Sequence, residues 1–167
     1  MGGNHSELIL NREVIAWKIR RMAYEIYERN MDEKELILAG IYDRGMAVAE
    51  RVAEVLKDIS PFKLHLINLN LDRQSPVNVT VSPEIDFTDK VIIVIDDVAN
   101  SGRTLLYAMK PLLMRLPKSI QTAVLVDRMH KAFPVIINYV GHSLSTTLQE
   151  NIRVDIRESE IGAVYLS

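Results

Sequence analysis

The chain contains, from Val91 to Thr104, the stretch Val-Ile-Ile-Val-Ile-Asp-Asp-Val-Ala-Asn-Ser-Gly-Arg-Thr. Its first five residues are apolar and β-branched, which is typical of a strand that is covered on both faces within a parallel sheet. Ligands of open α/β sheets bind beyond the carboxyl ends of such strands, where Asp96 and Asp97 would lie. Residues 101–104 would bring backbone N–H groups together at the start of a helix, an arrangement that favours phosphate binding.

The acids and the phosphate loop together restrict the ligand. Two carboxylates would repel a bare phosphate, so the ligand should also carry hydroxyl groups that donate to Asp96 and Asp97, or bring a metal ion. A sugar phosphate meets both demands. The alternative is an ordinary strand followed by an Asp N-cap and a solvated turn.

The composition indicates one globular domain, residues 1–167, because 48% of its residues are hydrophobic and can form a sizeable core. The absence of cysteine excludes disulfides and thiolate metal sites. A formal charge of −2 argues against a protein that coats nucleic acid, although a local basic face stays open. The start, Met1 to Glu7, lacks the pattern of a leader, and no apolar run approaches about eighteen residues, so we expect a cytoplasmic protein without membrane contact.

Further strands and helices alternate along the chain. Residues 36–41 and 120–126 are apolar strand candidates, and a helix follows the first of them through about Lys57. An earlier helix begins after Asn11, a candidate N-cap, and its apolar stripe is Ile15, Ile19, Met22 and Ile26. This order predicts an α/β fold with a Rossmann-like, open, mostly parallel twisted sheet flanked by helices.

Three segments carry less regular patterns. Residues 62–71 alternate with one slip at Ile67, which predicts a strand with a bulge. The chain is polar from Asp72 to Glu84 except for 77–81, which suggests a small β flap over about 71–88, with a rigid hairpin as the alternative. Residues 104–115 have helical spacing, and Pro111 would kink that helix.

The polar side of the first helix is basic. It carries Arg12, Lys18, Arg20 and Arg21 on an otherwise acidic protein. A solvated helix face is the more common explanation of such a cluster, and a contact surface for a nucleic-acid backbone is the functional one.

The stretch from Val91 to Thr104 resembles the phosphoribosyl pyrophosphate signature of the type I phosphoribosyltransferases. The resemblance implies that Asp96 and Asp97 hold the ribose 2′- and 3′-hydroxyls and that the following loop holds the 5′-phosphate. The loop after the strand at 36–41 resembles the family's pyrophosphate loop, in which Arg44 would act with the two acids in catalysis. Together the resemblance assigns to phosphoribosyl pyrophosphate the residues Tyr42, Asp43, Arg44, Gly45, Asp96, Asp97, Val98, Ala99, Asn100, Ser101, Gly102, Arg103 and Thr104.

Residues 123–134 and 138–141 resemble one branch of that family, the pyrimidine-operon attenuation proteins that double as uracil phosphoribosyltransferases. The likeness runs from Arg21 to Ile156. It implies a base-binding segment at about 127–145, where His142 replaces a residue that is commonly lysine. The base-binding residues would be Arg128, Tyr139, Val140, Gly141 and His142. A lone His130 is left outside the catalytic set.

The reaction implied is transfer of 5-phosphoribose to a base, with Mg²⁺ bound mainly through substrate and water, and Asp96 and Asp97 as further candidate ligands. Asn100 stands where purine-using relatives carry an acid, and an amide cannot act as a base, which favours uracil as substrate and UMP as product. The alternatives are a purine (hypoxanthine or guanine) enzyme, a UMP-sensing RNA-binding regulator, and a relative whose altered loops have lost efficient catalysis. The resemblance also implies a homo-oligomer, a dimer or a tetramer.

Overall fold

A six-stranded sheet is the centre of the computed structural model, which describes residues 6–147 and 149–167. The expectation about a leader pattern rests largely on Met1 to His5, which lie outside the described residues. The strand order is β4-β3-β2-β5-β6-β7, and every neighbouring pair is parallel except β3 and β4. The strands are β2 (Glu35–Ile41), β3 (Lys63–Leu71), β4 (Val79–Ser82), β5 (Val91–Ala99), β6 (Ser119–Arg128) and β7 (Tyr139–Leu144). The expected α/β fold is confirmed.

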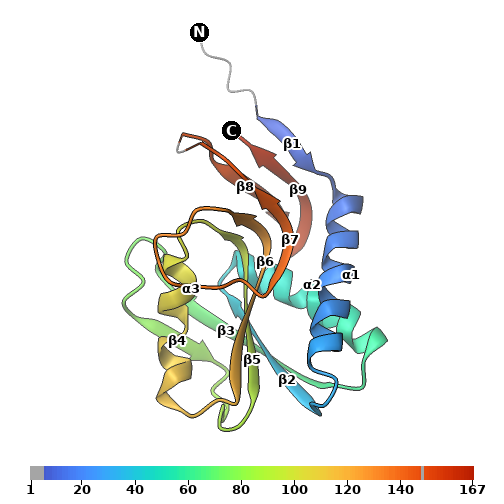
Figure 1. Cartoon of the computed structure of the whole chain (residues 1–167), viewed down its shortest axis with the longest axis vertical. Helices are drawn as coiled ribbons and strands as arrows, with labels where there is room; N and C mark the ends of the chain where they lie inside the picture. Colours follow the sequence, from blue (N-terminus) through green and yellow to red (C-terminus); the bar gives the residue numbers. More distant parts are fainter. Residues whose placement is uncertain (1–5, 148) are drawn as a thin grey trace.

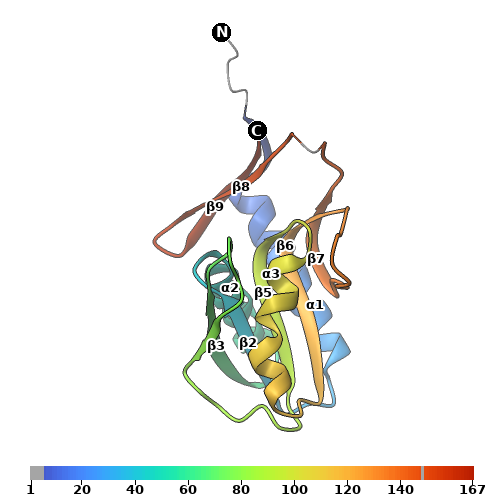
Figure 2. The ribbon, with the colours of Figure 1, turned by 90° about the vertical axis from the view of Figure 1, so that its left-hand side faces the viewer.

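Helices cover both faces of this sheet, as Figures 1 and 2 show. The long helices α1 (Arg12–Arg29) and α2 (Arg44–Ile59) pack on one face, and α3 (Arg103–Ala108) with the 3-10 helix η1 (Lys110–Met114) packs on the other. Residues 91–95 of β5 therefore alternate between two apolar layers, and all five are at most 3% exposed. Burial on both faces is the reason for their continuous apolar run.

The first helix begins where its sequence predicts. The Asn11 side chain accepts a hydrogen bond from the Val14 backbone N–H at 2.9 Å, which is an N-cap. The apolar stripe of this helix is buried in the core. In the described part of the chain, none of the helices has the length and hydropathy of a membrane-spanning segment.

A second, smaller sheet lies beyond the carboxyl edge of the main one (Figure 1). It is antiparallel and consists of β1 (Glu7–Leu10), β9 (Glu160–Leu166) and β8 (Ile152–Arg157), in that order. The patterns in the sequence do not predict this sheet. Glu158 and Ser159 both have positive φ at the β8–β9 turn, and neither is the glycine or asparagine that usually marks such a turn.

The expected bulge in residues 62–71 is wrong. The pairing of β3 with β2 runs without a register shift from Lys63 opposite Glu35 to Leu69 opposite Ile41. Ile67 is 1% exposed because apolar layers cover both faces of this strand. The slip in alternation therefore reflects burial on two sides.

The helix expected over 104–115 is divided. Regular α-helix ends at Ala108, and the 3-10 helix η1 follows with Pro111 in its first turn. Proline has no N–H to donate to the preceding turn, so the α-helical ladder stops there.

The polar region at 71–88 contains a hairpin. Strand β4 pairs with the end of β3, from Leu71 opposite Val79 to Asn68 opposite Ser82. The loop between them is fastened to the 3-10 helix by Lys110, whose Nζ donates to the Val77 carbonyl at 2.7 Å. The segment thus lies along one edge of the main sheet.

Candidate functional site

Asp96 and Asp97 lie near the carboxyl end of β5, at the centre of the main sheet. Their residues are 1% and 5% exposed. Adjacent strand residues point to opposite faces, so each acid has a different set of partners. Asp96 Oδ1 accepts from the Asp97 backbone N–H at 2.9 Å, and Asp97 Oδ1 accepts from the Val98 N–H at 2.8 Å.

Arg73 holds Asp96, a contact that sequence analysis did not anticipate. Its Nη1 donates to Asp96 Oδ2 and its Nη2 to Asp96 Oδ1, both at 2.9 Å. Two parallel bonds of this kind are the strongest geometry for an arginine–carboxylate pair. Arg73 precedes Asp96 by 23 residues and lies in a polar loop without a motif, so no sequence signal marked it.

Arg44, at the first position of α2, holds the other acid. Its Nε donates to Asp97 Oδ2 at 2.8 Å, and its Nη2 donates to the carbonyl of Val154 in β8. Arg44 therefore joins the acid pair to the small sheet. The structure brings together Asp96, Asp97 and Arg44, which the sequence assigned to catalysis.

Gly45 allows this close approach. A Cβ atom at Gly45 would lie 2.5 Å from the Ile95 carbonyl oxygen and 2.9 Å from the Asp96 Cα. Both contacts are with backbone, so a side chain here would push α2 away from β5. The preceding residues Tyr42 and Asp43 form the short loop between β2 and α2.

The loop after β5 borders a cavity. Gly102 has φ of 85°, a left-handed conformation that suits glycine, and α3 begins directly after it. The Ser101 carbonyl accepts from the N–H groups of Ala132 and Phe133, at 3.0 and 3.1 Å. The cavity has a volume of about 290 Å³ and is lined by Arg73, Asp96, Val98, Ala99, Asn100, Ser101, Gly102, Arg103, Thr104 and Leu105.

The environment of the acids affects their protonation. Burial raises the pKa of Asp96 to about 7, and the charge of Asp97 adds to the rise while the contacts with Arg73 oppose it. Two adjacent carboxylates cannot both stay charged when they are buried unless cations compensate them. Arg73 and Arg44 are those cations in this structure.

Arg128 lies at the carboxyl end of β6 and fastens the segment that leads to β8. Its guanidinium donates to Thr146 Oγ1, to the Thr147 carbonyl and, at 2.7 Å, to the Glu150 carbonyl. Next to it, Asp127 accepts from Lys131 Nζ at 2.6 Å. The carboxyl end of β6 thus has an ordered set of polar groups beside the loop after β5.

Tyr139 is placed elsewhere, which corrects its expected role in base binding. It pairs with Ala123 in the middle of β6, is 2% exposed, and its hydroxyl donates to Gln121 Oε1 at 2.6 Å. The phenol therefore belongs to the core. The resemblance placed Tyr139 in a base-binding segment at about 127–145, whereas Tyr139 begins β7, a strand that runs toward the carboxyl edge of the sheet.

The next residues of β7 face the first helix. The carbonyls of Val140 and Gly141 accept from Arg21 Nη2 at 3.1 and 2.6 Å. A Cβ at Gly141 would lie 2.4 Å from the Leu125 carbonyl, so close strand packing explains this glycine. Burial, with Lys18 adding to it, lowers the pKa of His142. These contacts are with α1 and β6, which also speaks against the expected base-binding role of residues 140–142.

The basic cluster on α1 is largely occupied by intramolecular contacts. Arg12 pairs with Glu160, and Arg21 pairs with Glu25. Arg20 lies over the Tyr24 ring, with its Cζ 5.4 Å from the ring centroid. Two of the four cations, Arg12 and Arg21, thus have acidic partners, which fits a solvated helix face.

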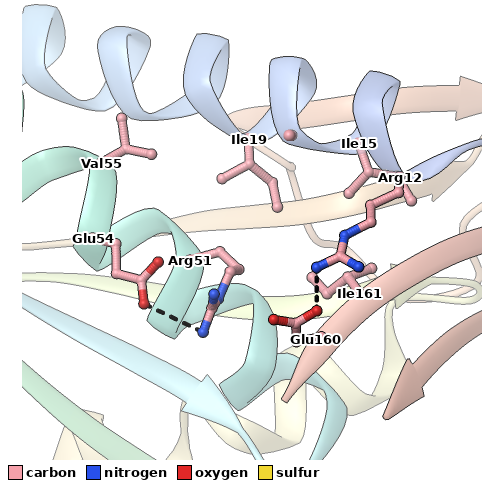
Figure 3. A pocket seen from close by; sticks show the side chains of 9 residues that line it. Arg12, Ile15, Ile19, Arg51, Glu54, Val55, Glu160 and Ile161 are labelled. Atoms are coloured by element: carbon pink, nitrogen blue, oxygen red, sulfur yellow. Dashed lines mark hydrogen bonds and ion pairs between the residues drawn. The ribbon is translucent and has the colours of Figure 1, made fainter. Parts of the chain in front are cut away.

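A second cavity, of about 270 Å³, lies between α1, α2 and β9 (Figure 3). Apolar side chains line part of it, with Ile15, Ile19 and Ile161 among them. Two ion pairs border it, Arg12 with Glu160 and Arg51 with Glu54, as Figure 3 shows. None of the site residues expected from the sequence lines it.

The carboxylates at the end of β5 suit a magnesium ion. Mg²⁺ keeps several waters and is bound in proteins by one or two carboxylates together with substrate phosphates. Among the described residues there is no group of three or more His, Cys, Asp or Glu side chains that could hold a metal ion.

The chain matches known proteins along most of its length. The phosphoribosyl transferase domain family matches residues 5–154. The bifunctional protein PyrR of Bacillus pumilus is 35% identical over 95% of this chain and 96% of its own. That of Streptococcus agalactiae is 37% identical over 85% of each chain.

Solved structures share the fold. The hypoxanthine phosphoribosyltransferase of Trypanosoma cruzi superposes with a TM-score of 0.78 at 14% identity and covers 94% of this chain and 95% of its own. A hypoxanthine-guanine phosphoribosyltransferase of Bacillus anthracis gives a TM-score of 0.73 at 17% identity, covering 83% and 82%. The acid pair, the glycine loop and these matches together lead to one conclusion. The chain belongs to the phosphoribosyltransferase family and is a transferase.

Proposed function

We propose that the protein transfers the 5-phosphoribosyl group of phosphoribosyl pyrophosphate to uracil, giving UMP and pyrophosphate, as a Mg²⁺-dependent homo-oligomer of the cytoplasm. One observation carries the proposal. Two buried carboxylates lie near the end of the central strand, and one of them, Asp96, lines a cavity of about 290 Å³ together with the loop whose Gly102 has a left-handed backbone. A ribose phosphate has the hydroxyls and the anion for which these two features provide partners.

The residues have distinct tasks in this reaction. Asp96 and Asp97 accept hydrogen bonds from the ribose hydroxyls, and the loop from Val98 to Thr104 binds the 5′-phosphate. Arg44, at the N-terminus of α2, binds the departing pyrophosphate. Mg²⁺, when bound, supplies positive charge that stabilises the leaving group.

The chemistry is a displacement at C1 of the ribose. The bond from C1 to the pyrophosphate oxygen breaks, the bond from C1 to a ring nitrogen of the base forms, and the proton of that nitrogen passes to solvent or to the departing pyrophosphate. Positive charge develops on the sugar ring during the step. The carboxylates stabilise this charge and keep the ring oriented, so positioning and electrostatics supply most of the rate enhancement.

We place the base at the carboxyl end of β6. Asp127 lies opposite Ala99 of β5 there, and Arg128 fastens the following segment at Thr146 and Glu150. We therefore assign base binding to these groups and not to Tyr139. The amide of Asn100, where purine-using relatives carry an acid, supports a pyrimidine.

Pyrophosphate release tests the proposal directly. The protein is mixed with Mg²⁺ and phosphoribosyl pyrophosphate, and uracil, hypoxanthine, guanine and xanthine are offered separately. Turnover with uracil supports the proposal. Turnover that favours hypoxanthine or guanine contradicts the choice of base, and turnover with none of them contradicts the activity. Sedimentation of the same sample gives the mass of the expected dimer or tetramer.

A second candidate is an RNA-binding regulator that senses UMP. Its support is the outer face of α1, where Trp17 is 65% exposed and Arg20 stacks on Tyr24. Aromatic and basic side chains together are typical of contacts with single-stranded RNA. Binding to pyrimidine-operon leader RNA that strengthens with UMP supports regulation, whereas binding that only falls with salt and ignores UMP argues against it.

A further inference from the structure

Arg73 occupies the oxygen atoms that a ribose would need. Its two bonds to Asp96 use both carboxylate oxygens, and Oδ1 also accepts from the Asp97 backbone N–H at 2.9 Å. A carboxylate oxygen has two lone pairs, so Oδ1 of Asp96 has none left for a sugar hydroxyl. The side chain of Asp96 is 1% exposed, and water cannot easily compete for it. A ribose can therefore bind Asp96 fully only if Arg73 moves.

The displaced guanidinium needs another anion. The side chain of Arg73 is 35% exposed. The negative charges of three carboxylates act on it. Burial lowers the pKa of Arg73, but Asp96, followed by Asp97 and Asp43, raises it above its ordinary value overall. Asp43 belongs to the loop before α2, so the charge of that loop also acts on Arg73. Moving a cation away from a buried carboxylate is unfavourable unless the ligand supplies new negative charge nearby.

The loop that carries Arg73 can make such a movement. It lies at the edge of the sheet, where β4 is only partly buried. Apart from Arg73 itself, side chains hold it through the bond of Lys110 to the Val77 carbonyl and a long bond, 3.4 Å, from Arg103 to the Gln74 carbonyl. Segments with few buried apolar contacts open at low free-energy cost.

We propose that Arg73 is a specificity-determining residue that exchanges between Asp96 and the diphosphate of the substrate. This inference rests on the proposed function. Phosphoribosyl pyrophosphate carries a diphosphate on C1, which gives the released guanidinium a new partner beside the loop before α2. Ribose 5-phosphate has the same hydroxyls and 5′-phosphate but no diphosphate. Arg73 therefore opens the ribose site to the former and keeps it closed to the latter.

Two dissociation constants measured with three proteins test the exchange. Calorimetry with Mg²⁺ gives the affinities of the unmodified protein, Arg73→Gln and Arg73→Lys for phosphoribosyl pyrophosphate and for ribose 5-phosphate. In Arg73→Gln the competitor for Asp96 loses its charge, so ribose 5-phosphate should bind about tenfold more tightly, because the competent fraction of sites rises. Phosphoribosyl pyrophosphate should bind about tenfold more weakly, because its diphosphate loses a charged donor. Arg73→Lys should fall between, since lysine keeps the charge without the fork.

The matched control is Lys110→Met, which loosens the same loop and leaves the Arg73–Asp96 contact in place. Its affinity for ribose 5-phosphate should stay within twofold of the unmodified protein, and equal tightening in both variants would show that loop mobility, not Arg73, is responsible. If Arg73→Gln binds ribose 5-phosphate with unchanged affinity while the unmodified protein binds phosphoribosyl pyrophosphate, the proposed exchange is wrong. The proposed function is then unaffected. If the unmodified protein binds neither ligand, the proposed function fails as well. Circular dichroism of each variant confirms that it is folded.

Discussion

At the scale of single residues, Gly45 is the position with the least room. A Cβ would meet backbone atoms of Ile95 and Asp96 at 2.5 and 2.9 Å. We expect Gly45→Ala to lower the free energy of unfolding by about 2 kcal/mol, because backbone cannot move aside as a flexible side chain can. Urea denaturation measures the change.

Gly162→Ala is the matched control for that measurement. A Cβ at Gly162 would lie 3.6 Å from Asp155 Oδ2, an ordinary contact. Its stability should therefore change by less than about 0.5 kcal/mol. An equal loss in both variants would mean that the close approach of α2 to β5 is not what requires Gly45.

Tyr139→Phe separates a core role from a base-binding role. The hydroxyl donates to Gln121 Oε1 at 2.6 Å inside the protein, and its loss should cost about 1 kcal/mol of stability. The KM for the base should be unchanged, because the phenol is buried in the core beside Gln121, away from the carboxyl end of β6. A raised KM for the base with unaltered stability would restore Tyr139 to the site.

The site residues differ in how far the neighbouring sequence predicts their position in the fold. Asp96 and Asp97 follow five apolar strand residues, so their place at the carboxyl edge could be predicted. Arg73 lies in a polar loop, and its pairing with Asp96 depends on how the β3–β4 hairpin is placed against β5. No local pattern encodes such a contact, and only the assembled fold reveals it.

At the scale of elements, Arg128 connects β6 to the segment before β8. We expect Arg128→Met to raise the KM for the base about tenfold while the KM for phosphoribosyl pyrophosphate changes little, because the fastened segment borders the proposed base site. Steady-state kinetics with each substrate varied in turn measures both. Arg157→Gln is the control, since its side chain is 84% exposed, and a similar effect there would contradict the assignment.

A charge cluster of Glu35, His65 and Lys90 lies toward the amino ends of β2, β3 and β5. Hydrogen bonds from Lys90, and then His65, lower the pKa of Glu35 from 4.5 to about 2. A lowered pKa means that the unfolded chain binds the proton more tightly, so this contribution to stability is present above pH 4.5 and is lost as the pH falls toward 2.

Removing the carboxylate should reduce that pH dependence. Between neutral pH and pH about 2, Glu35→Gln should lose less stability than the unmodified protein does, as measured by urea denaturation at each pH. Glu28→Gln, at an exposed position on α1, should lose as much as the unmodified protein. Parallel curves for all three proteins would show that the cluster does not contribute.

Helices and strands with a strong hydrophobic periodicity could be predicted from the sequence. Features that depend on which strands pair, or on what covers them, could not. The strand at 91–95 and the N-cap of α1 follow from residue type and spacing. The division of the helix at 104–115 follows from Pro111, although its 3-10 character does not. Burial on both faces produced the irregular alternation in β3, because the pattern of a strand depends on what covers it.

At the scale of the whole molecule, the two sheets meet at the site. Arg44 bonds to Asp97 of the main sheet and to the Val154 carbonyl of the small sheet. The sequence patterns predict the main sheet but not the small one. Its strand β1 pairs with β9 from the other end of the chain, a contact that carries no local signal. The hairpin of β8 and β9 is local, but its turn at Glu158 and Ser159 lacks the residues that usually mark one.

The central claim is that the acid pair and the glycine loop bind phosphoribosyl pyrophosphate. The most direct test is calorimetric titration of phosphoribosyl pyrophosphate with Mg²⁺ into the unmodified protein and into Asp97→Asn. We predict saturable binding of one molecule per chain, weakened at least about tenfold in the variant because a charged acceptor is lost. No binding by the unmodified protein, or equal affinity in the two proteins, would contradict the account.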